Sequence, residues 1–144
     1  MSRAALLSLL VAGTAPGALA QPTYPVKPLR IIVAQSPGGV TDALARLYAQ
    51  KLNEAWKQPV IVENRAGAGG TIGTEAAVKA APDGYTLLLS SAGPIVINQS
   101  LYRNLGYDPL QALTPLAFIA SSALVLGTHP SVPASNVASL VALA

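Results

Sequence analysis

The sequence contains no cysteine and a single histidine, His129. The absence of cysteine excludes a disulfide framework, a thiolate zinc or iron–sulfur site and a cysteine nucleophile. One histidine and six dispersed acidic residues do not form a metal-ligand cluster, so we expect neither a metal site nor a catalytic group. Any histidine-dependent triad has to use His129, which precedes Pro130 and which we expect to lie at the surface in a turn.

Charged residues are also scarce, at 10% of the 144 residues, and the nine Lys and Arg residues are scattered with no two adjacent. Nucleic-acid-binding proteins normally gather basic residues in a patch or stripe. The net charge of +3 therefore does not indicate a nucleic-acid partner. Hydrophobic residues make up 51% of the chain, which is enough for a sizeable core and excludes intrinsic disorder.

Residues 1–20 have the pattern of a secretory signal. Arg3 supplies a short positive region, an apolar run follows from Ala4 to Ala12, and the segment ends in the small-residue site Ala18-Leu19-Ala20. The apolar run is well short of the ~20 residues that a membrane span needs. The sequence predicts cleavage after Ala20 and an exported mature chain that does not itself span a membrane.

The mature sequence alternates short apolar runs with helical patterns. Residues 29–34, 60–63 and 85–89 have the composition of buried strands. Apolar positions at helical spacing follow from Thr41, which suits an N-cap, and an alanine-rich helix is predicted from about residue 72 to 81. Strands that alternate with helices predict an α/β fold with a parallel sheet covered on both faces.

Several local expectations complete this pattern. Pro94 suits the first turn of a further helix, residues 113–119 and 124–127 are compatible with strands, and an Asn or Ser cap near Asn136 opens a last helix. Tyr48 and Trp56 fall on the apolar side of the first helix, where we expect them to join the core.

Three loops rich in glycine or serine, residues 36–41, 64–71 and 90–93, follow the predicted strands. In a parallel sheet these loops meet at the carboxyl edge, where ligands bind. Their backbone N–H groups, together with the positive ends of the helices that follow the first two loops, favour an anion such as a carboxylate. The alternative is that these glycines only make tight turns.

Asp42 allows two interpretations, because a carboxylate repels a bound anion. It suits the first turn of a helix and has Arg46 four residues later, which favours an ion pair on the helix surface. Alternatively, Asp42 receives an amine or a hydroxyl of the ligand and so selects substituted acids.

The run from Gly67 to Gly73 invites comparison with the dinucleotide motif G-x-G-x-x-G. The third glycine falls one place late, and no acidic residue follows at the required distance. We therefore expect no cofactor. A hydrolase that uses Ser36 or Ser91 as its nucleophile lacks the G-x-S-x-G motif and has only His129 as a base. We keep an exported α/β hydrolase as the alternative function.

Longer motifs carry a family resemblance. The segments YPVKPLRIIVAQSPGGVTD, QPVIVENRAGAGGTIGTEAAVKAAPDGYTLLL, INQSLY and YDPLQALTPL resemble the Bug, or TctC, family of solute receptors of tripartite tricarboxylate transporters. The resemblance implies a periplasmic binding protein-like (type II) fold of two lobes and a periplasmic location. It also implies a small di- or tricarboxylate as ligand, transporter permease subunits as partners, and no enzymatic activity.

The resemblance also implies which residues bind the acid, largely through backbone N–H groups. Gln35 departs from the family pattern because an aromatic residue is frequent there, and Ala112 replaces an acidic residue. The positions that match the family's ligand loops are Ser36, Pro37, Gly38, Gly39, Thr41, Asp42, Asn64, Gly67, Gly69, Gly70 and Ser91.

Family members are considerably longer than this chain. The resemblance therefore predicts an incomplete first α/β lobe over residues 21–122, and a crossover with only the start of the second lobe over residues 123–144. Because closure between lobes traps the ligand, we expect a truncated receptor with impaired binding. A non-binding remnant is the corresponding alternative.

Overall fold

The computed structural model of the protein describes residues 23–144, so the predicted signal and its cleavage site lie outside the described residues. The chain divides into two compact units, of which the first ends at Leu113 and the second is Thr114–Ala144. The predicted boundary between the lobes, after residue 122, concerns the layout of a longer receptor and stays a prediction.

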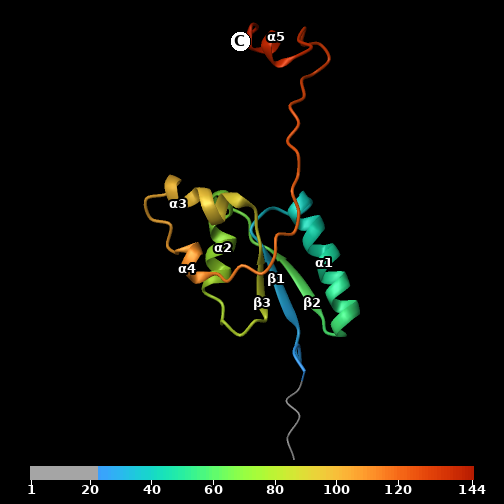
Figure 1. The fold of residues 1–144 in the computed structure, drawn as a ribbon, viewed down its shortest axis with the longest axis vertical. Helices are drawn as coiled ribbons and strands as arrows, with labels where there is room; N and C mark the ends of the chain where they lie inside the picture. Colours follow the sequence, from blue (N-terminus) through green and yellow to red (C-terminus); the bar gives the residue numbers. More distant parts are fainter. Residues whose placement is uncertain (1–22) are drawn as a thin grey trace, which may run out of the picture. The chain divides into compact units, whose positions relative to one another are not determined.

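The first unit is built on a parallel sheet in the order β2-β1-β3 (Figure 1). Its strands β1 (Leu29–Val33), β2 (Val60–Asn64) and β3 (Thr86–Leu89) confirm the three strands predicted from short apolar runs. Parallel strands require crossover connections, and helices supply them here. The mixed α/β fold class predicted from the sequence is therefore confirmed.

Helix α1 (Val40–Trp56) follows β1, and α2 (Thr71–Val78) follows β2 through the short 3-10 helix η1 (Ala68–Gly70). The predicted N-cap Thr41 is wrong, because α1 begins earlier and Gly39 is its N-cap. The predicted end of the second helix near residue 81 is also late, because α2 ends at Val78 and the next turn tightens, with Ala80 N–H donating to Ala77 O at 3.1 Å. After β3, η2 (Gly93–Ile97) runs directly into α3 (Asn98–Leu101), and Pro94 lies in the first turn of η2 as predicted.

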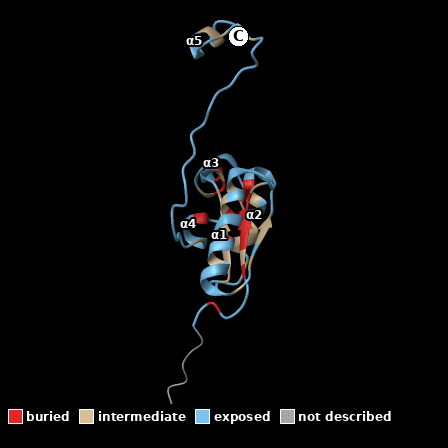
Figure 2. Ribbon diagram, turned by 90° about the vertical axis from the view of Figure 1, so that its right-hand side faces the viewer, coloured by how far each residue is buried: buried red, intermediate tan, exposed pale blue. Residues whose placement is uncertain are grey.

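The two crossover helices cover opposite faces of the sheet. Ile31 and Val33 pack with Ala45 and Ala49 of α1 in the hydrophobic core. Side chains alternate along a strand, so Ala34 faces the other side, where α2 approaches it. Figure 2 shows that the buried residues gather in the strands between these helices.

Tyr48 and Trp56 do not belong to the core, contrary to the prediction. Their side chains are 37% and 36% exposed, because Ala45 and Ala49 occupy the sheet-facing positions of α1. The ring of Trp56, the last residue of α1, instead lies edge-on against Tyr24, with ring centroids 6.0 Å apart.

Helix α4 (Pro109–Ala112) ends the first unit, and its N-terminus is capped by Asp108, whose Oδ1 accepts from the backbone N–H of Leu110 at 3.0 Å. Ala112, one of the departures from the family pattern, is the last residue of α4 and is exposed. The position is remote from the three loops in the sequence and lies in a short turn of helix.

The second unit contains α5 (Val137–Val141), whose predicted N-cap Asn136 is confirmed by a bond from Ser139 N–H to Asn136 Oδ1 of 2.9 Å. The predicted strands at 113–119 and 124–127 are wrong: the structure gives no strand there. A strand needs a neighbour to satisfy its backbone groups, and none pairs with these segments in the described residues. His129 is exposed, as predicted, and its Nδ1 lies 2.7 Å from Ser131 Oγ.

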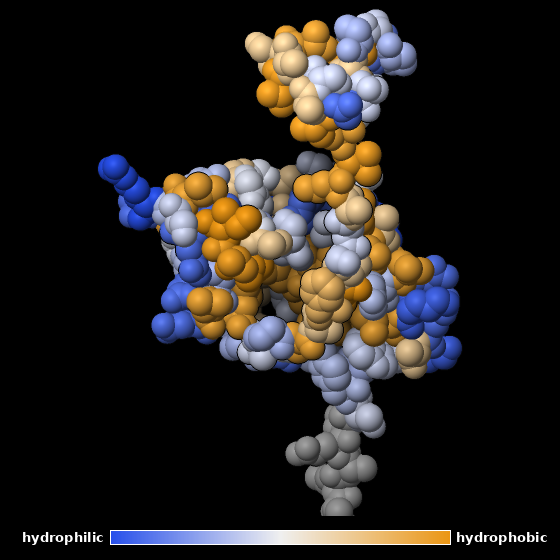
Figure 3. All heavy atoms as spheres, turned by 45° about the horizontal axis from the view of Figure 1, so that its top comes forward, coloured by the Kyte–Doolittle hydropathy of each residue, from blue (hydrophilic) through white to orange (hydrophobic). Residues whose placement is uncertain are grey.

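Apolar side chains remain exposed in both units. Figure 3 shows apolar surface on the first unit in the region of α3, where Ile97 and Leu101 are 51% and 70% exposed. In the second unit Phe118 and Leu124 are 85% and 99% exposed. Among the residues the structure describes, no helix combines the length and apolar character needed to cross a membrane.

Candidate functional site

A hollow of about 650 Å³ lies at the carboxyl ends of β1, β2 and β3, where the three predicted loops meet. This convergence follows from the parallel sheet, because its strands all end at one edge. Ala34, Gln35 and Ala66 complete the wall. The predicted site residues that line the hollow are Ser36, Pro37, Gly38, Gly39, Gly67, Gly69, Gly70 and Ser91.

The first loop presents backbone donors to this hollow. Gly39, the N-cap of α1, has no side chain to cap the helix, and the first internal helix bond runs from Ala43 N–H to Gly39 O at 3.0 Å. The N–H groups of the first turn are therefore left without helix partners. The 17-residue helix also directs the positive end of its dipole to this loop.

The carboxylate of Asp42 is hydrogen-bonded to the backbone of the first loop. Its Oδ2 accepts from the backbone N–H of Gly38 at 2.9 Å and from Arg46 Nε at 3.1 Å, and its Oδ1 accepts from Asn64 Nδ2 at 2.9 Å. The predicted pair with Arg46 is confirmed. Bonds from Arg46, Gly38 and Asn64 lower the pKa of the Asp42 carboxyl to about 2. The side chain is buried and does not line the hollow.

Asn64 joins the first two loops. Its amide nitrogen donates to Asp42 and, at 3.3 Å, to the backbone oxygen of Gln35, while its own oxygen accepts from Arg46 Nη2 at 3.2 Å. Neither Asn64 nor the half-buried Thr41 is among the residues that line the hollow. The role of these two residues at the ligand stays a prediction.

The second loop turns sharply through left-handed backbone. Gly69 and Gly70 have φ angles of 62° and 88°, a region that favours glycine. Asn98, only 5% exposed, donates its amide hydrogens to Gly69 O at 3.2 Å and to Thr71 Oγ1 at 3.1 Å. Asn98 was not predicted as a site residue, although it stands in the quoted INQSLY motif.

Gly73, the late third glycine of the run resembling a dinucleotide motif, serves packing between α2 and β1. A Cβ atom there would lie 2.6 Å from Arg65 O and 2.7 Å from Ala34 Cα. Both are backbone atoms that cannot move aside freely. Gly73 therefore allows the close approach of helix and strand that brings the second loop to the hollow.

Gln35 and Ser91 connect the first and third loops across the wall. Gln35 Nε2 donates to Ser91 Oγ at 3.1 Å. Gln35 Oε1 and the hydroxyl oxygen of Ser90 are buried and have no hydrogen-bond partner among the described residues. The sequence signalled Gln35 only as a departure from the family pattern.

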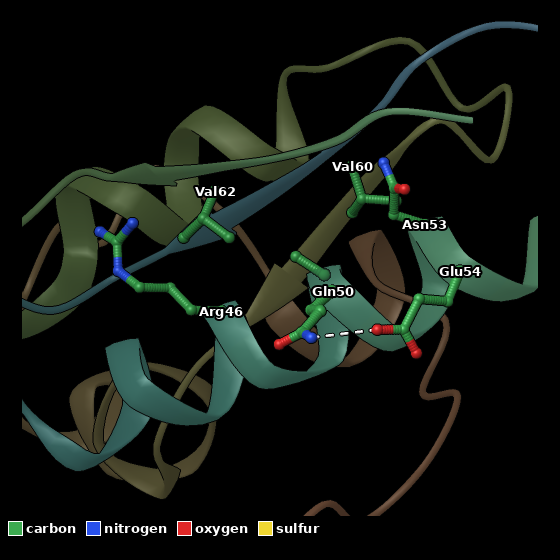
Figure 4. A pocket seen from close by; sticks show the side chains of 7 residues that line it. Arg46, Gln50, Asn53, Glu54, Val60 and Val62 are labelled. Carbon is green, nitrogen blue, oxygen red and sulfur yellow. Dashed lines mark hydrogen bonds between the residues drawn. The ribbon is translucent and has the colours of Figure 1, made fainter. Parts of the chain in front are cut away.

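A second hollow, of about 490 Å³, lies between α1 and β2, away from the predicted loops (Figure 4). It is lined by Arg46, Gln50, Glu54 and Val62 among others, and Gln50 Nε2 donates to Glu54 Oε1 at 3.0 Å. It contains none of the predicted site residues.

The described residues contain no group of three His, Cys, Asp or Glu side chains that could hold a metal ion. The hydrolase alternative requires His129 beside Ser36 or Ser91. The Nδ1 atom of His129 lies within hydrogen-bonding distance of Ser131 Oγ, at 2.7 Å.

Residues 44–144 match the family described as the tripartite tricarboxylate transporter family receptor, TctC. The chain belongs to the TctC family. The family is described as one of transporter receptors, which confirms the family resemblance predicted from the motifs.

Among curated proteins, BugT of Bordetella pertussis is 46% identical over 121 residues, covering 83% of this chain and 37% of BugT. A UPF0065 protein of the same organism is 37% identical over 98% of this chain and 42% of its own length. The chain thus spans about two fifths of the length of these relatives.

Solved structures of TctC-like proteins share the fold. Rpa4515 of R. palustris, solved with adipate, is 35% identical with a TM-score of 0.78 over 83% of this chain and 40% of that chain. MatC of Rhodopseudomonas palustris, solved with bound malate, is 35% identical with a TM-score of 0.63 over 67% of this chain and 33% of that chain. The periplasmic binding protein BugD is 44% identical, with a TM-score of 0.58 over 62% of this chain and 29% of that chain.

The Asp42 network predicts an acid-dependent loss of stability. Because the pKa of Asp42 is about 2 when folded and 3.8 ordinarily, this carboxylate stabilises the fold above about pH 4. That contribution is lost as the pH falls through about 2. Urea titrations at several pH values should show a steeper fall in the free energy of unfolding between pH 4 and 2 for the wild type than for Asp42→Asn.

The matched control for this prediction is Glu75→Gln, which removes a carboxylate that pairs with Lys79 on the surface of α2. Exposed pairs of this kind contribute little to stability. If Asp42→Asn and Glu75→Gln show the same pH profile, the Asp42 network does not stabilise the loop.

Proposed function

We propose that this chain carries the carboxylate-binding part of a periplasmic solute receptor. In this role it binds a small organic acid, such as a di- or tricarboxylate, and passes it to the permease subunits of a tripartite tricarboxylate transporter. The observation that carries the proposal is the hollow at the carboxyl edge of the sheet, whose wall includes Gly39, the N-cap of α1, with no side chain that caps the helix.

The chemistry of the wall supports an anionic ligand. None of the side chains that line the hollow is charged, so backbone dipoles supply the positive potential. One carboxylate oxygen accepts from N–H groups of the first loop, and the hydroxyls of Ser36 and Ser91 donate to the other. Such bonds to an ionised group are stronger than neutral ones.

Asp42 fits this proposal as a positioning residue. Its negative charge is matched by Arg46 and by the N–H of Gly38, so it holds the first loop without facing the ligand. Asn64 supports the same loop through its bonds to Asp42 and to the backbone oxygen of Gln35. This arrangement lets an acidic residue stand three positions after Gly39 without repelling a bound carboxylate.

The known ligands of the relatives support the class of ligand. Rpa4515 was solved with adipate and MatC with malate, both dicarboxylates. Both proteins are 35% identical to this chain over the aligned regions, with TM-scores of 0.78 and 0.63. The chain covers two fifths of these relatives or less, so we place only one carboxylate of the ligand on this chain.

Binding can be tested by NMR titration of the mature chain, residues 21–144, with succinate and adipate. We expect the backbone amides of residues 38–41 and 67–70 to shift with millimolar dissociation constants. Succinamide, which has the carbon skeleton of succinate but no charge, should cause no such shifts. Shifts that spread over the surface without these amides, or no shifts at all, would exclude the proposed site.

A variant pair tests the role of the loop hydroxyl. Ser36→Ala should weaken binding of succinate about tenfold, because it removes one hydrogen bond to a charged group. Ser131→Ala, which changes an exposed serine of the second unit, should leave the dissociation constant unchanged. Equal affinities for both variants would contradict the assigned role of Ser36.

A further inference from the structure

The side chain of Gln35 has unused hydrogen-bonding capacity at the wall of the hollow. Its nitrogen donates to Ser91 Oγ, whereas its oxygen is buried with no partner among the described residues. A buried amide oxygen that has lost water without gaining a donor is costly. A ligand group that donates to the Gln35 amide is therefore favoured over one that does not.

Gln35 also lies where a substituent of the ligand would be found. It lines the same hollow as Ser36, Gly38 and Gly39 and directly precedes them in the chain. A carboxylate held by that loop brings its neighbouring carbon atom toward Gln35. The Ser91 hydroxyl, which accepts from Gln35, keeps its own hydrogen free to donate.

We propose that Gln35 makes the site selective for acids that carry a hydroxyl group on the carbon next to the bound carboxylate. The inference rests on the proposed function, since it places the carboxylate on the first loop. A hydroxyl both donates and accepts, so it pairs with either end of the Gln35 amide when the terminal bond rotates. A methylene at the same place leaves the amide unpaired, and such a loss discriminates between ligands.

Asp42, which the sequence also offered as a selector of substituted acids, does not have this capacity. Its two oxygens already accept from Gly38, Arg46 and Asn64, and it does not line the hollow. A ligand hydroxyl would have to break that network to reach it. We therefore assign the selectivity to Gln35, a wall residue whose buried amide oxygen has no hydrogen-bond partner among the described residues.

The test uses malate and succinate, two four-carbon dicarboxylates that differ by one hydroxyl group. In NMR titrations of the mature chain, the wild type should bind the better enantiomer of malate about three- to tenfold more tightly than succinate. Gln35→Met, which keeps the length but loses the amide, should reduce this ratio to about one. The affinity for malate should fall more than the affinity for succinate.

Gln50→Met is the matched control, since Gln50 lines the other hollow and its loss should leave the ratio unchanged. An unchanged ratio in Gln35→Met overturns the selectivity of Gln35 but leaves carboxylate binding intact. Equal weakening of both acids by Gln35→Met also overturns it, because that result indicates a structural role. Absence of shifts in residues 38–41 with either acid overturns this inference together with the proposed function.

Discussion

Gly73→Ala is expected to lower the free energy of unfolding by about 1–3 kcal/mol. The added Cβ would lie 2.6 Å from Arg65 O and 2.7 Å from Ala34 Cα, so α2 would have to move away from β1. A decrease in stability would be opposite to the intrinsic helix preference. Inside a helix alanine is ordinarily favoured over glycine by about 1 kcal/mol, so a helix without this close approach would be stabilised by the same substitution.

The control for Gly73 is Gly93→Ala at the start of η2. A Cβ at Gly93 would meet only Ser91 Oγ, at an ordinary distance of 3.8 Å. Urea unfolding should therefore give a change within about 0.5 kcal/mol for Gly93→Ala. A neutral or stabilising effect of Gly73→Ala would show that α2 and β1 do not require the glycine.

The effect of Gly73→Ala should extend to the ligand. Gly70 lies three residues before it and also approaches the end of β1, where its Cβ would lie 3.2 Å from Ala34 O. Displacement of α2 therefore carries the second loop away from the hollow. We expect weaker binding of succinate in Gly73→Ala, measured by the same NMR titration, and unchanged binding in Gly93→Ala.

The arrangement of the loops was predictable because it follows from a few local signals. Apolar runs of strand length, such as residues 29–34, alternate with helical spacing, and this alternation requires a parallel sheet. Once the sheet is parallel, the loops after its strands must share one edge. Ser36, Gly67 and Ser91, which are far apart in the sequence, could therefore be placed together without any contact being known.

The contacts behind the wall were not predictable in this way. Asn64 bonds Asp42 across 22 residues, and Asn98 bonds Gly69 across 29 residues. Hydrophobic periodicity assigns an element and a face, but it does not specify which polar side chain reaches which loop. The sequence therefore predicts Thr41 and Asn64 as site residues without the contacts of Asn64, and it does not indicate Asn98.

The predicted strands beyond residue 113 failed for a different reason. Apolar runs indicate burial, yet burial depends on a partner surface. Within the described residues, no strand pairs with the segments at 113–119 and 124–127, and Phe118 and Leu124 are highly exposed. Composition alone predicts the strand but not the neighbour that it needs.

Asn98→Ala is expected to destabilise the first unit by about 1–3 kcal/mol. Asn98 is 5% exposed, and its amide hydrogens bond Gly69 O at 3.2 Å and Thr71 Oγ1 at 3.1 Å. Alanine removes both donors and leaves Gly69 O without them. The left-handed turn at Gly69 then loses the contact that ties the second loop to α3.

Urea unfolding of Asn98→Ala should be compared with Asn53→Ala, which changes an exposed asparagine on α1 and should shift stability by less than about 0.5 kcal/mol. Asn98→Asp adds a second comparison. It keeps the size of the side chain but replaces the donor with an acceptor that faces Gly69 O. It should therefore lower the free energy of unfolding at least as much as Asn98→Ala. If both Asn98 variants match Asn53→Ala, the second loop keeps its shape without Asn98.

Hydrogen exchange tests the same contacts locally. Because Asn98 bonds Gly69 O and Thr71 Oγ1, loss of these bonds should increase amide hydrogen exchange at residues 69–71, on one side of the hollow, before the whole unit unfolds.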